Sequence, residues 1–177
     1  RTISSKQQKE LKETTYDVND LLNEYFDFVT EKIDVQRGLT LVVDPGNGSA
    51  CDMLPLYEKL GHTVHGINTT FDGTFPGRGP NPNEKTTGQA SEKVRQAHAD
   101  FAVAFDADAD RGNVLDNTGP FVPPEKIAVI IAKNSEKIGN VVASVDCSIL
   151  LERELNGTGI HVIRGKVGDV FMAQAVK

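Results

Sequence analysis

A cluster of acidic residues is the segment of this chain best suited to do chemistry. Asp106, Asp108 and Asp110 stand at alternate positions, and the next residue is Arg111. The cluster follows the apolar run at residues 101–105, which is typical of a buried strand. In open α/β sheets, ligands usually bind where such strands end. Three converging carboxylates are hard oxygen donors, so the pattern predicts a site for Mg²⁺ or Ca²⁺ and not for zinc.

Three other interpretations of the acidic cluster can be compared with the sequence. A calcium-binding EF-hand loop that starts at Asp106 needs Gly at its sixth position and Glu at its twelfth, and these positions hold Arg111 and Asn117. A haloacid-dehalogenase-type loop needs Thr or Val where this chain has Asp110. A solvated acidic turn stays open, although such turns rarely follow five core residues directly. Without a cation, two carboxylates ~4 Å apart repel each other by about 4 kcal/mol at an effective dielectric constant of about 20.

Two segments carry weaker signals for anion binding. The Gly-Asn-Gly turn at residues 46–48 could bind a phosphate at the start of a helix. Cys51 stands where a dinucleotide-binding fingerprint has its third Gly, and no Gly-Lys-Ser/Thr follows, so a structural turn is favoured. Arg78 lies in a Gly/Pro-rich loop, where it could bind an anion or stay solvated, and both possibilities stay open. The four histidines show no metal-ligand spacing: His62, His65, His98 and His161.

The elements that must position these residues follow from hydrophobic periodicity. Apolar residues at helical spacing predict a first helix over residues 16–33. Ser49 is expected to cap a helix that runs to Leu60 and is kinked or divided at Pro55. Asp169 is expected to cap the last helix. Further helices are expected at residues 84–98, 127–133 and 149–155, and strands at residues 39–43, 62–67, 101–105, near Val114, at 141–145 and at 160–163.

This alternation predicts an α/β fold in which a mostly parallel sheet carries helices on its faces. We expect a linker at residues 1–15, an α/β domain with the acidic cluster at residues 16–120, and the beginning of a second α/β domain at residues 121–177. The second unit is expected to be incomplete because two strands are too few for a sheet of usual size. Within the first, three strands should run parallel, and the strand near Val114 should pair antiparallel.

Composition and net charge exclude some classes of binding partner. The chain has 177 residues, 38% of them hydrophobic and 25% charged, with a net charge of −6. The negative charge argues against nucleic acid or an anionic membrane as the main partner. No apolar run approaches the ~20 residues of a membrane span, and no signal-peptide pattern occurs, so we expect a cytoplasmic protein. Cys51 and Cys147 are expected to be reduced, buried thiols. Because the chain begins with Arg1, we expect a fragment.

Several motifs, which occur in a fixed order, together resemble the α-D-phosphohexomutases, the family of phosphomannomutase, phosphoglucomutase and phosphoglucosamine mutase. The Asp-x-Asp-x-Asp-Arg segment is similar to that family's metal loop, although the family more often has Gly in place of Ala107, where Ala restricts the backbone. The other matching segments are residues 43–48, residues 75–82, Asp116 with Gly119, and residues 167–169.

The resemblance implies a role in phosphoryl transfer. It implies that Asp106, Asp108 and Asp110 bind Mg²⁺ against the phosphate of a phosphoserine, and that Arg111 steadies the phosphoryl group or the nearby carboxylates. The family interconverts hexose 1-phosphate and hexose 6-phosphate through a sugar 1,6-bisphosphate. Its serine loop, sugar-recognition loop and final phosphate site do not occur in this sequence. We therefore expect a phosphorylated hexose and the remaining domains of a parent chain as partners, and no activity from this chain alone. The alternative is a non-catalytic metal-binding or assembly module with the same fold.

Overall fold

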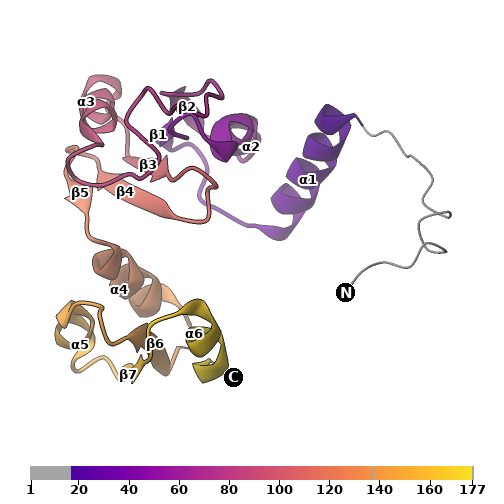
Figure 1. The fold of residues 1–177 in the computed structure, drawn as a ribbon. Helices are drawn as coiled ribbons and strands as arrows, with labels where there is room; N and C mark the ends of the chain where they lie inside the picture. The colour runs from indigo at the N-terminus through magenta and orange to yellow at the C-terminus, as the bar shows by residue number, and fades with distance from the viewer. Residues whose placement is uncertain (1–16, 137, 177) are drawn as a thin grey trace, which may run out of the picture.

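The computed structural model describes residues 17–136 and 138–176, so the linker expected at residues 1–15 lies outside the described residues. Helices and strands alternate along the chain, as the sequence predicts (Figure 1). The helices are α1 (Val18–Lys32), the 3₁₀ helix η2 (Ser49–Met53), α2 (Leu54–Lys59), α3 (Gly88–Ala97), α4 (Pro124–Asn134), α5 (Leu150–Leu155) and α6 (Asp169–Ala175). The strands are β1 (Thr40–Asp44), β2 (Thr63–Gly66), β3 (Phe101–Phe105), β4 (Gly112–Asp116), β5 (Phe121–Val122), β6 (Asn140–Ser144) and β7 (His161–Gly165).

The first sheet has five strands in the order β2-β1-β3-β4-β5. Strand β1 pairs parallel with β2 and β3, and β4 returns antiparallel to β3, which confirms the predicted α/β fold and strand directions. Residues 121–122, which the sequence analysis assigned to the second unit, form the short strand β5, and this strand pairs antiparallel with β4. The cause is a tight turn after β4, in which Gly119 has φ +100° and its N–H donates to the carbonyl of Asp116. This turn returns Phe121 to a position beside Leu115.

Helices cover both faces of this sheet. Strands β2 and β3 lie on opposite sides of β1, so two right-handed crossovers place α2 and α3 on opposite faces. Under α3, a closed core forms around Val42, Ala90, Val94, Ala102 and Leu115. Strand β1 is buried from Leu41 onward, which explains its continuous apolar sequence. The sheet therefore gives the residues at its carboxyl edge a rigid base.

Three helix starts differ from the sequence-based predictions. Gly48, not Ser49, is the N-terminal cap of η2, and the expected helix is divided into η2 and α2 because Pro55 occupies the first turn of α2. Helix α3 begins at residue 88 and not at residue 84, because Asn83 holds residues 84–87 in a turn. The side chain of Asn83 accepts a hydrogen bond from the Lys85 N–H, and its backbone carbonyl accepts one from the Thr87 hydroxyl. In α6 the cap is Gly168, and Asp169 lies inside the first turn.

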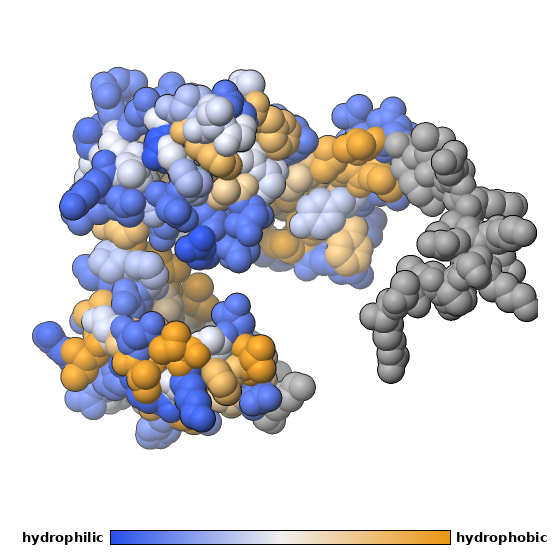
Figure 2. All heavy atoms as spheres, viewed as in Figure 1, coloured by the Kyte–Doolittle hydropathy of each residue, from blue (hydrophilic) through white to orange (hydrophobic). Residues whose placement is uncertain are grey.

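The second unit is small and open. Strands β6 and β7 form a parallel pair, and a cluster of Val129, Ala132, Ala143, Leu151 and Leu155 fills the space between the pair and its helices. Figure 2 shows hydrophobic residues on the visible surface of this unit. The exposed hydrophobic side chains of this unit are Ile130, Ile131, Val145, Ile149, Ile163, Val167, Val170, Phe171 and Val176.

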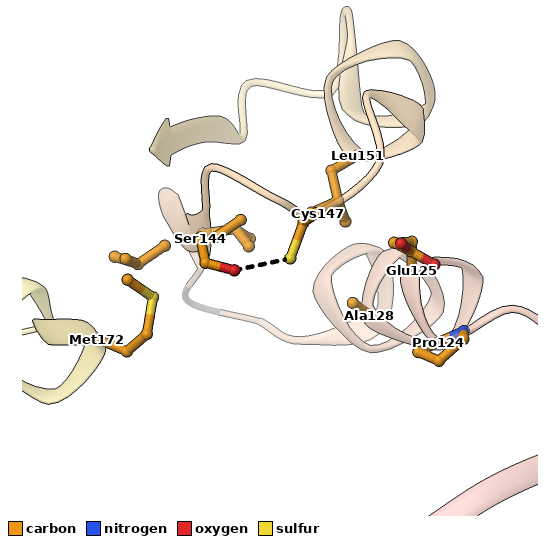
Figure 3. A pocket seen from close by; sticks show the side chains of 10 residues that line it. Pro124, Glu125, Ala128, Ser144, Cys147, Leu151 and Met172 are labelled. Carbon is orange, nitrogen blue, oxygen red and sulfur yellow. Dashed lines mark hydrogen bonds between the residues drawn. The ribbon is translucent and has the colours of Figure 1, made fainter. Parts of the chain in front are cut away.

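A pocket of about 360 Å³ opens within the second unit (Figure 3). Apolar residues such as Ala128, Leu151 and Met172 line it, together with Ser144 and Cys147, whose side chains lie 3.3 Å apart. Both cysteines of the chain are free thiols. Cys51 is buried, and this burial, followed by the charges of Asp52 and Asp44, raises the pKa of its thiol. In the part of the chain that the structure describes, no helix has the length and apolar character needed to cross a bilayer.

Candidate metal centre

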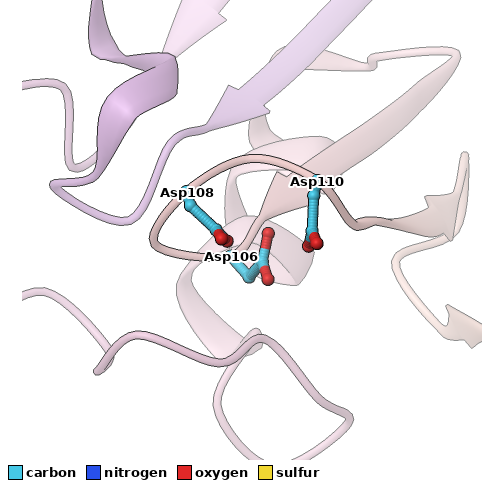
Figure 4. A group of neighbouring side chains, drawn as sticks. All are labelled: Asp106, Asp108 and Asp110. Carbon is cyan, nitrogen blue, oxygen red and sulfur yellow. The ribbon is translucent and has the colours of Figure 1, made fainter. Parts of the chain in front are cut away.

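The acidic cluster forms a tight loop between β3 and β4, at the carboxyl end of β3 (Figure 4). The Asp106 N–H donates to the Arg111 carbonyl over 3.2 Å, and the Ala109 N–H donates to the Asp106 carbonyl over 3.2 Å. These bonds curl the loop so that Asp106, Asp108 and Asp110 each offer an oxygen within 4.8 Å of the others. The structure therefore brings together the three side chains that the sequence analysis singled out.

The backbone of the loop accommodates alanine at both intervening positions. Ala109 has φ +60°, a left-handed conformation that costs an L-residue roughly 1–2 kcal/mol, whereas Ala107 does not lie in that region. The restriction expected at Ala107 is thus not a problem for the loop. Instead, the Ala107 carbonyl accepts a hydrogen bond of 2.9 Å from the Ser49 N–H. An added Cβ at Gly48 would lie 2.5 Å from the same carbonyl oxygen, so only glycine allows this close approach.

The three carboxylates lie in different surroundings. The side chain of Asp106 is 2% exposed, whereas that of Asp110 is 70% exposed. Arg111 donates its backbone N–H to Asp106 Oδ1 over 3.1 Å and its Nε to Asp106 Oδ2 over 2.7 Å, and Nε also lies 3.3 Å from Asp110 Oδ1. Burial by itself opposes ionisation of Asp106, but the hydrogen bonds and charge of Arg111 outweigh it and lower the pKa of this carboxyl. The same contacts raise the pKa of Arg111.

The balance of charge in the loop suits a divalent cation. Among the residues that the structure describes, Asp108 has no hydrogen-bond or ion-pair partner, while Arg111 pairs with the other two carboxylates. Three carboxylates and one guanidinium leave two formal negative charges at the edge of the sheet. Carboxylate oxygens are the donors that hard divalent cations such as Mg²⁺ and Ca²⁺ prefer.

The irregular segment after β2 forms one wall of the site. Asn81 accepts from Arg111 Nη2 over 3.4 Å, and the carbonyl of Pro82 accepts from Asn113 Nδ2 over 3.0 Å. Residues 75–82, which resemble a family motif, therefore lie beside the acidic loop. Sequence reasoning missed Asn81 as a contact of Arg111, and the Pro-Asn-Pro context was the only available signal.

Arg78 plays neither of the roles considered from the sequence. Its side chain is 2% exposed, so it is neither solvated nor available to an external anion. It donates from Nε to Asp44 Oδ2 over 2.7 Å, from Nη2 to the Asp44 carbonyl over 3.1 Å, and from Nη1 to the Gly79 carbonyl over 3.1 Å. Nη2 also donates to the Phe105 carbonyl. A buried Asp44 was not foreseen, although an aspartate closing an apolar strand is an unusual residue there.

The turn at residues 46–48 is structural, as favoured. Gly46 N–H donates to Asp44 Oδ1, the Asn47 N–H to the Asn68 carbonyl, and the Gly48 N–H to the Pro45 carbonyl. The Asn47 side chain also bridges the Thr70 carbonyl and the Gly77 N–H. Because the protein itself occupies these amides, the turn does not have the free N–H groups that a phosphate site requires.

The fold and this edge define an α/β/α domain whose central sheet carries an oxygen-rich acidic loop at the carboxyl end of a parallel strand. The family model for phosphoglucomutase/phosphomannomutase, alpha/beta/alpha domain II, matches residues 23–119. The model for alpha/beta/alpha domain III of the same family matches residues 123–177. The chain belongs to the phosphoglucomutase/phosphomannomutase family, in agreement with the resemblance found in its motifs.

Relatives and solved structures agree with this assignment. The chain is 35% identical to a probable phosphoglucosamine mutase of Methanothermobacter thermautotrophicus, over 92% of this chain and 35% of that protein. It is 40% identical to a probable phosphoglucosamine mutase of Pyrococcus furiosus, over 85% of this chain and 34% of that protein. A phosphoglucomutase/phosphomannomutase family protein of Burkholderia thailandensis superposes with a TM-score of 0.78 at 27% identity, over 92% of this chain and 36% of that one. The chain thus spans about a third of the length of the relatives it matches.

Proposed function

We propose that this chain is the part of a phosphohexomutase that supplies the Mg²⁺ loop. The parent enzyme would interconvert hexose 1-phosphate and hexose 6-phosphate through a phosphoserine and a sugar 1,6-bisphosphate. Residues 16–120 would form the domain that carries the loop, and residues 121–177 would begin the next domain. The observation that carries the proposal is the convergence of Asp106, Asp108 and Asp110 within the part of the chain that matches domain II of the family.

In this proposal the three aspartates hold Mg²⁺, which supplies positive charge to the oxygens of the phosphoryl group. Arg111 orients Asp106 through the two bonds described above. Its side chain is 68% exposed, and among the described residues its Nη1 has no partner, so this nitrogen is free to donate to a phosphoryl oxygen. Arg111 therefore combines two tasks: it fixes the buried ligand and it contacts the transferred group.

The partners that the proposal requires are a phosphorylated hexose and the other domains of the parent chain. The names of the relatives support the substrate class. We place the protein in the cytoplasm, where the free thiols Cys51 and Cys147 would stay reduced. The chain alone should give no mutase turnover, because its sequence lacks the family's serine loop.

Metal titration of this chain tests the proposal. We expect weak binding of Mg²⁺ in calorimetry, because Mg²⁺ gives up its water reluctantly and finds only three protein ligands. Asp108→Asn removes one ligand charge and should lower the affinity at least tenfold, while apo Asp108→Asn should melt slightly higher because one repelling charge is gone. Asp34→Asn, an equal change of charge on an exposed residue, is the control and should leave the affinity unchanged.

Two outcomes would contradict the proposal. If Asp108→Asn binds Mg²⁺ as well as the parent chain, the loop is a solvated acidic turn. If Asp108→Asn in the full-length parent keeps full turnover in a coupled assay while it loses the metal, the site is a non-catalytic metal-binding module.

A further inference from the structure

A buried arginine links the ends of the two strands that support the acidic loop. Asp44 and Phe105 are the last residues of β1 and β3, which are neighbours in the sheet. Arg78 comes from the irregular segment between β2 and α3 and bonds to the Asp44 carboxylate and to the Phe105 carbonyl. It therefore holds the two strand ends at a set spacing, next to the point where the chain leaves the sheet.

The Asp44–Arg78 pair is suited to fix the position of the strand ends and not to bind a ligand. The side chains of Arg78 and Asp44 are 2% and 1% exposed. Asp44 Oδ1 also accepts from the Gly46 N–H over 2.9 Å and from Asn68 Nδ2 over 3.0 Å, so the carboxylate is fully engaged. A buried ion pair seldom stabilises a fold more than a well-packed apolar pair does. An apolar pair cannot donate to a carbonyl, however, and donation to Phe105 is what the arginine adds.

Two peptide groups near Asp106 are held from the β1 side: the one that joins Phe105 to Asp106 and the one that joins Ala107 to Asp108. The carbonyl of Phe105 belongs to the peptide group that ends in the Asp106 N–H, and Arg78 fixes its direction. The carbonyl of Ala107, on the other side, is fixed by the Ser49 N–H, at the end of the turn that begins at Asp44. The same turn contacts the guanidinium, because an added Cβ at Gly46 would lie 2.5–2.7 Å from its atoms.

We propose that the buried Asp44–Arg78 pair positions the acidic loop, and above all Asp106, for metal binding. The proposal rests on the proposed function, because it takes the loop to be the Mg²⁺ site. Arg78 is a positioning residue in this account, since its side chain is buried and its bonds go to Asp44 and to backbone carbonyls, not to the side chains of the metal ligands. Loss of a supporting partner outside the ligand set typically lowers metal affinity 10–100-fold.

The test uses Mn²⁺ as a probe, with binding followed by electron paramagnetic resonance, and hydrogen exchange of peptides that cover residues 105–111. The main variant is Asp44→Asn with Arg78→Met, which removes both charges together and leaves no lone buried charge. We expect it to stay folded, to bind Mn²⁺ about tenfold more weakly, and to exchange faster at the Asp106 and Ala109 amides. Arg78→Lys should keep the charge pair and most of the stability. Its affinity for Mn²⁺ should nevertheless fall below that of the parent chain, because one ammonium cannot reach all the acceptors that the guanidinium reaches.

Two controls separate positioning from general destabilisation. Arg164→Met removes a comparable arginine in the second unit, which bonds to Glu152 and to the carbonyls of Ser144 and Cys147, and it should leave Mn²⁺ affinity within twofold. Gly46→Ala places a methyl group against the Arg78 guanidinium and should weaken Mn²⁺ binding. Gly38→Ala is its matched control: Gly38 also has a positive φ, +79°, but no neighbour lies within 4 Å of the added Cβ, so Mn²⁺ binding should not change.

The outcomes are distinct. A folded double variant with unchanged Mn²⁺ affinity and unchanged exchange of the loop would overturn the inference. A parent chain that binds no Mn²⁺ would overturn the proposed function instead, and the exchange of residues 105–111 in the double variant would then decide whether the pair positions the loop.

Discussion

Arg78 and Arg164 make the same kinds of bond in the two units, but they lie at different depths. Each pairs with one carboxylate and with backbone carbonyls near the end of a parallel strand. The pair of Arg78 with Asp44 is 2% and 1% exposed, whereas the pair of Arg164 with Glu152 is 26% and 38% exposed. Because water can replace the exposed partner and cannot reach the buried one, we expect the fold to depend more on the buried pair than on the exposed pair.

The surrounding sheets differ in the same way. Strand β1 has neighbours on both sides and helices on both faces, and its last four residues are buried. Strands β6 and β7 form a two-stranded sheet, and Ile163 of β7 is exposed. The five-stranded sheet carries the acidic loop, and a sheet covered by helices is the more rigid base for ligands that must converge on a small cation.

The largest expected difference between the units comes from removal of one carboxylate. Asp44→Ala leaves Arg78 buried without its partner and should lower the free energy of unfolding of the first unit by about 3–5 kcal/mol. Glu152→Ala should lower the free energy of unfolding of the second unit far less, because Arg164 can turn to water. Native-state hydrogen exchange, which reports each unit separately, measures both. Equal losses would show that depth does not separate the two pairs.

A smaller effect is expected from substitution of Gly48, which contacts the acidic loop. Gly48→Ala places a methyl group against the Ala107 carbonyl and should cost about 1–3 kcal/mol of stability and weaken Mn²⁺ binding. Gly139→Ala, ahead of β6, meets nothing within 4 Å and should change stability by no more than about 0.5 kcal/mol. Urea unfolding followed by circular dichroism, with a parallel Mn²⁺ titration, measures both variants. A harmless Gly48→Ala would mean that the loop does not need this close approach.

The smallest effect concerns the pH dependence of the exposed pair. Hydrogen bonds from Arg164 are the main reason that the pKa of Glu152 lies below its ordinary value of 4.5. Because the folded-state pKa is the lower one, the pair adds stability above the unfolded-state pKa, and this stability is lost as the pH falls through the folded-state pKa. The melting temperatures of the parent chain and Glu152→Gln should therefore differ at neutral pH and converge below pH 4.5. Glu24→Gln on α1 is the control, and a difference that persists in acid would contradict this account.

Local patterns predicted much of the fold and the acidic cluster. The apolar run at residues 101–105 indicated a buried strand. Because Asp106, Asp108 and Asp110 follow its last residue, the pattern also placed them at the carboxyl edge of the sheet. Two errors have a common cause. Ser49 and Asp169 looked like helix caps, because cap positions depend on contacts that a short window of sequence does not contain.

Periodicity and spacing are properties of neighbouring residues, and they were enough to predict the order of strands and helices, the direction of the early strands and the grouping of the three aspartates. The environment of each charged side chain depends instead on tertiary packing. Arg78 and Asp44 are 34 residues apart in the chain and lie in a single buried pair, while Arg111 stays at the surface beside Asp106. A charged side chain becomes a structural partner or a solvated group according to what packs around it, and that packing exists only after the strands have assembled.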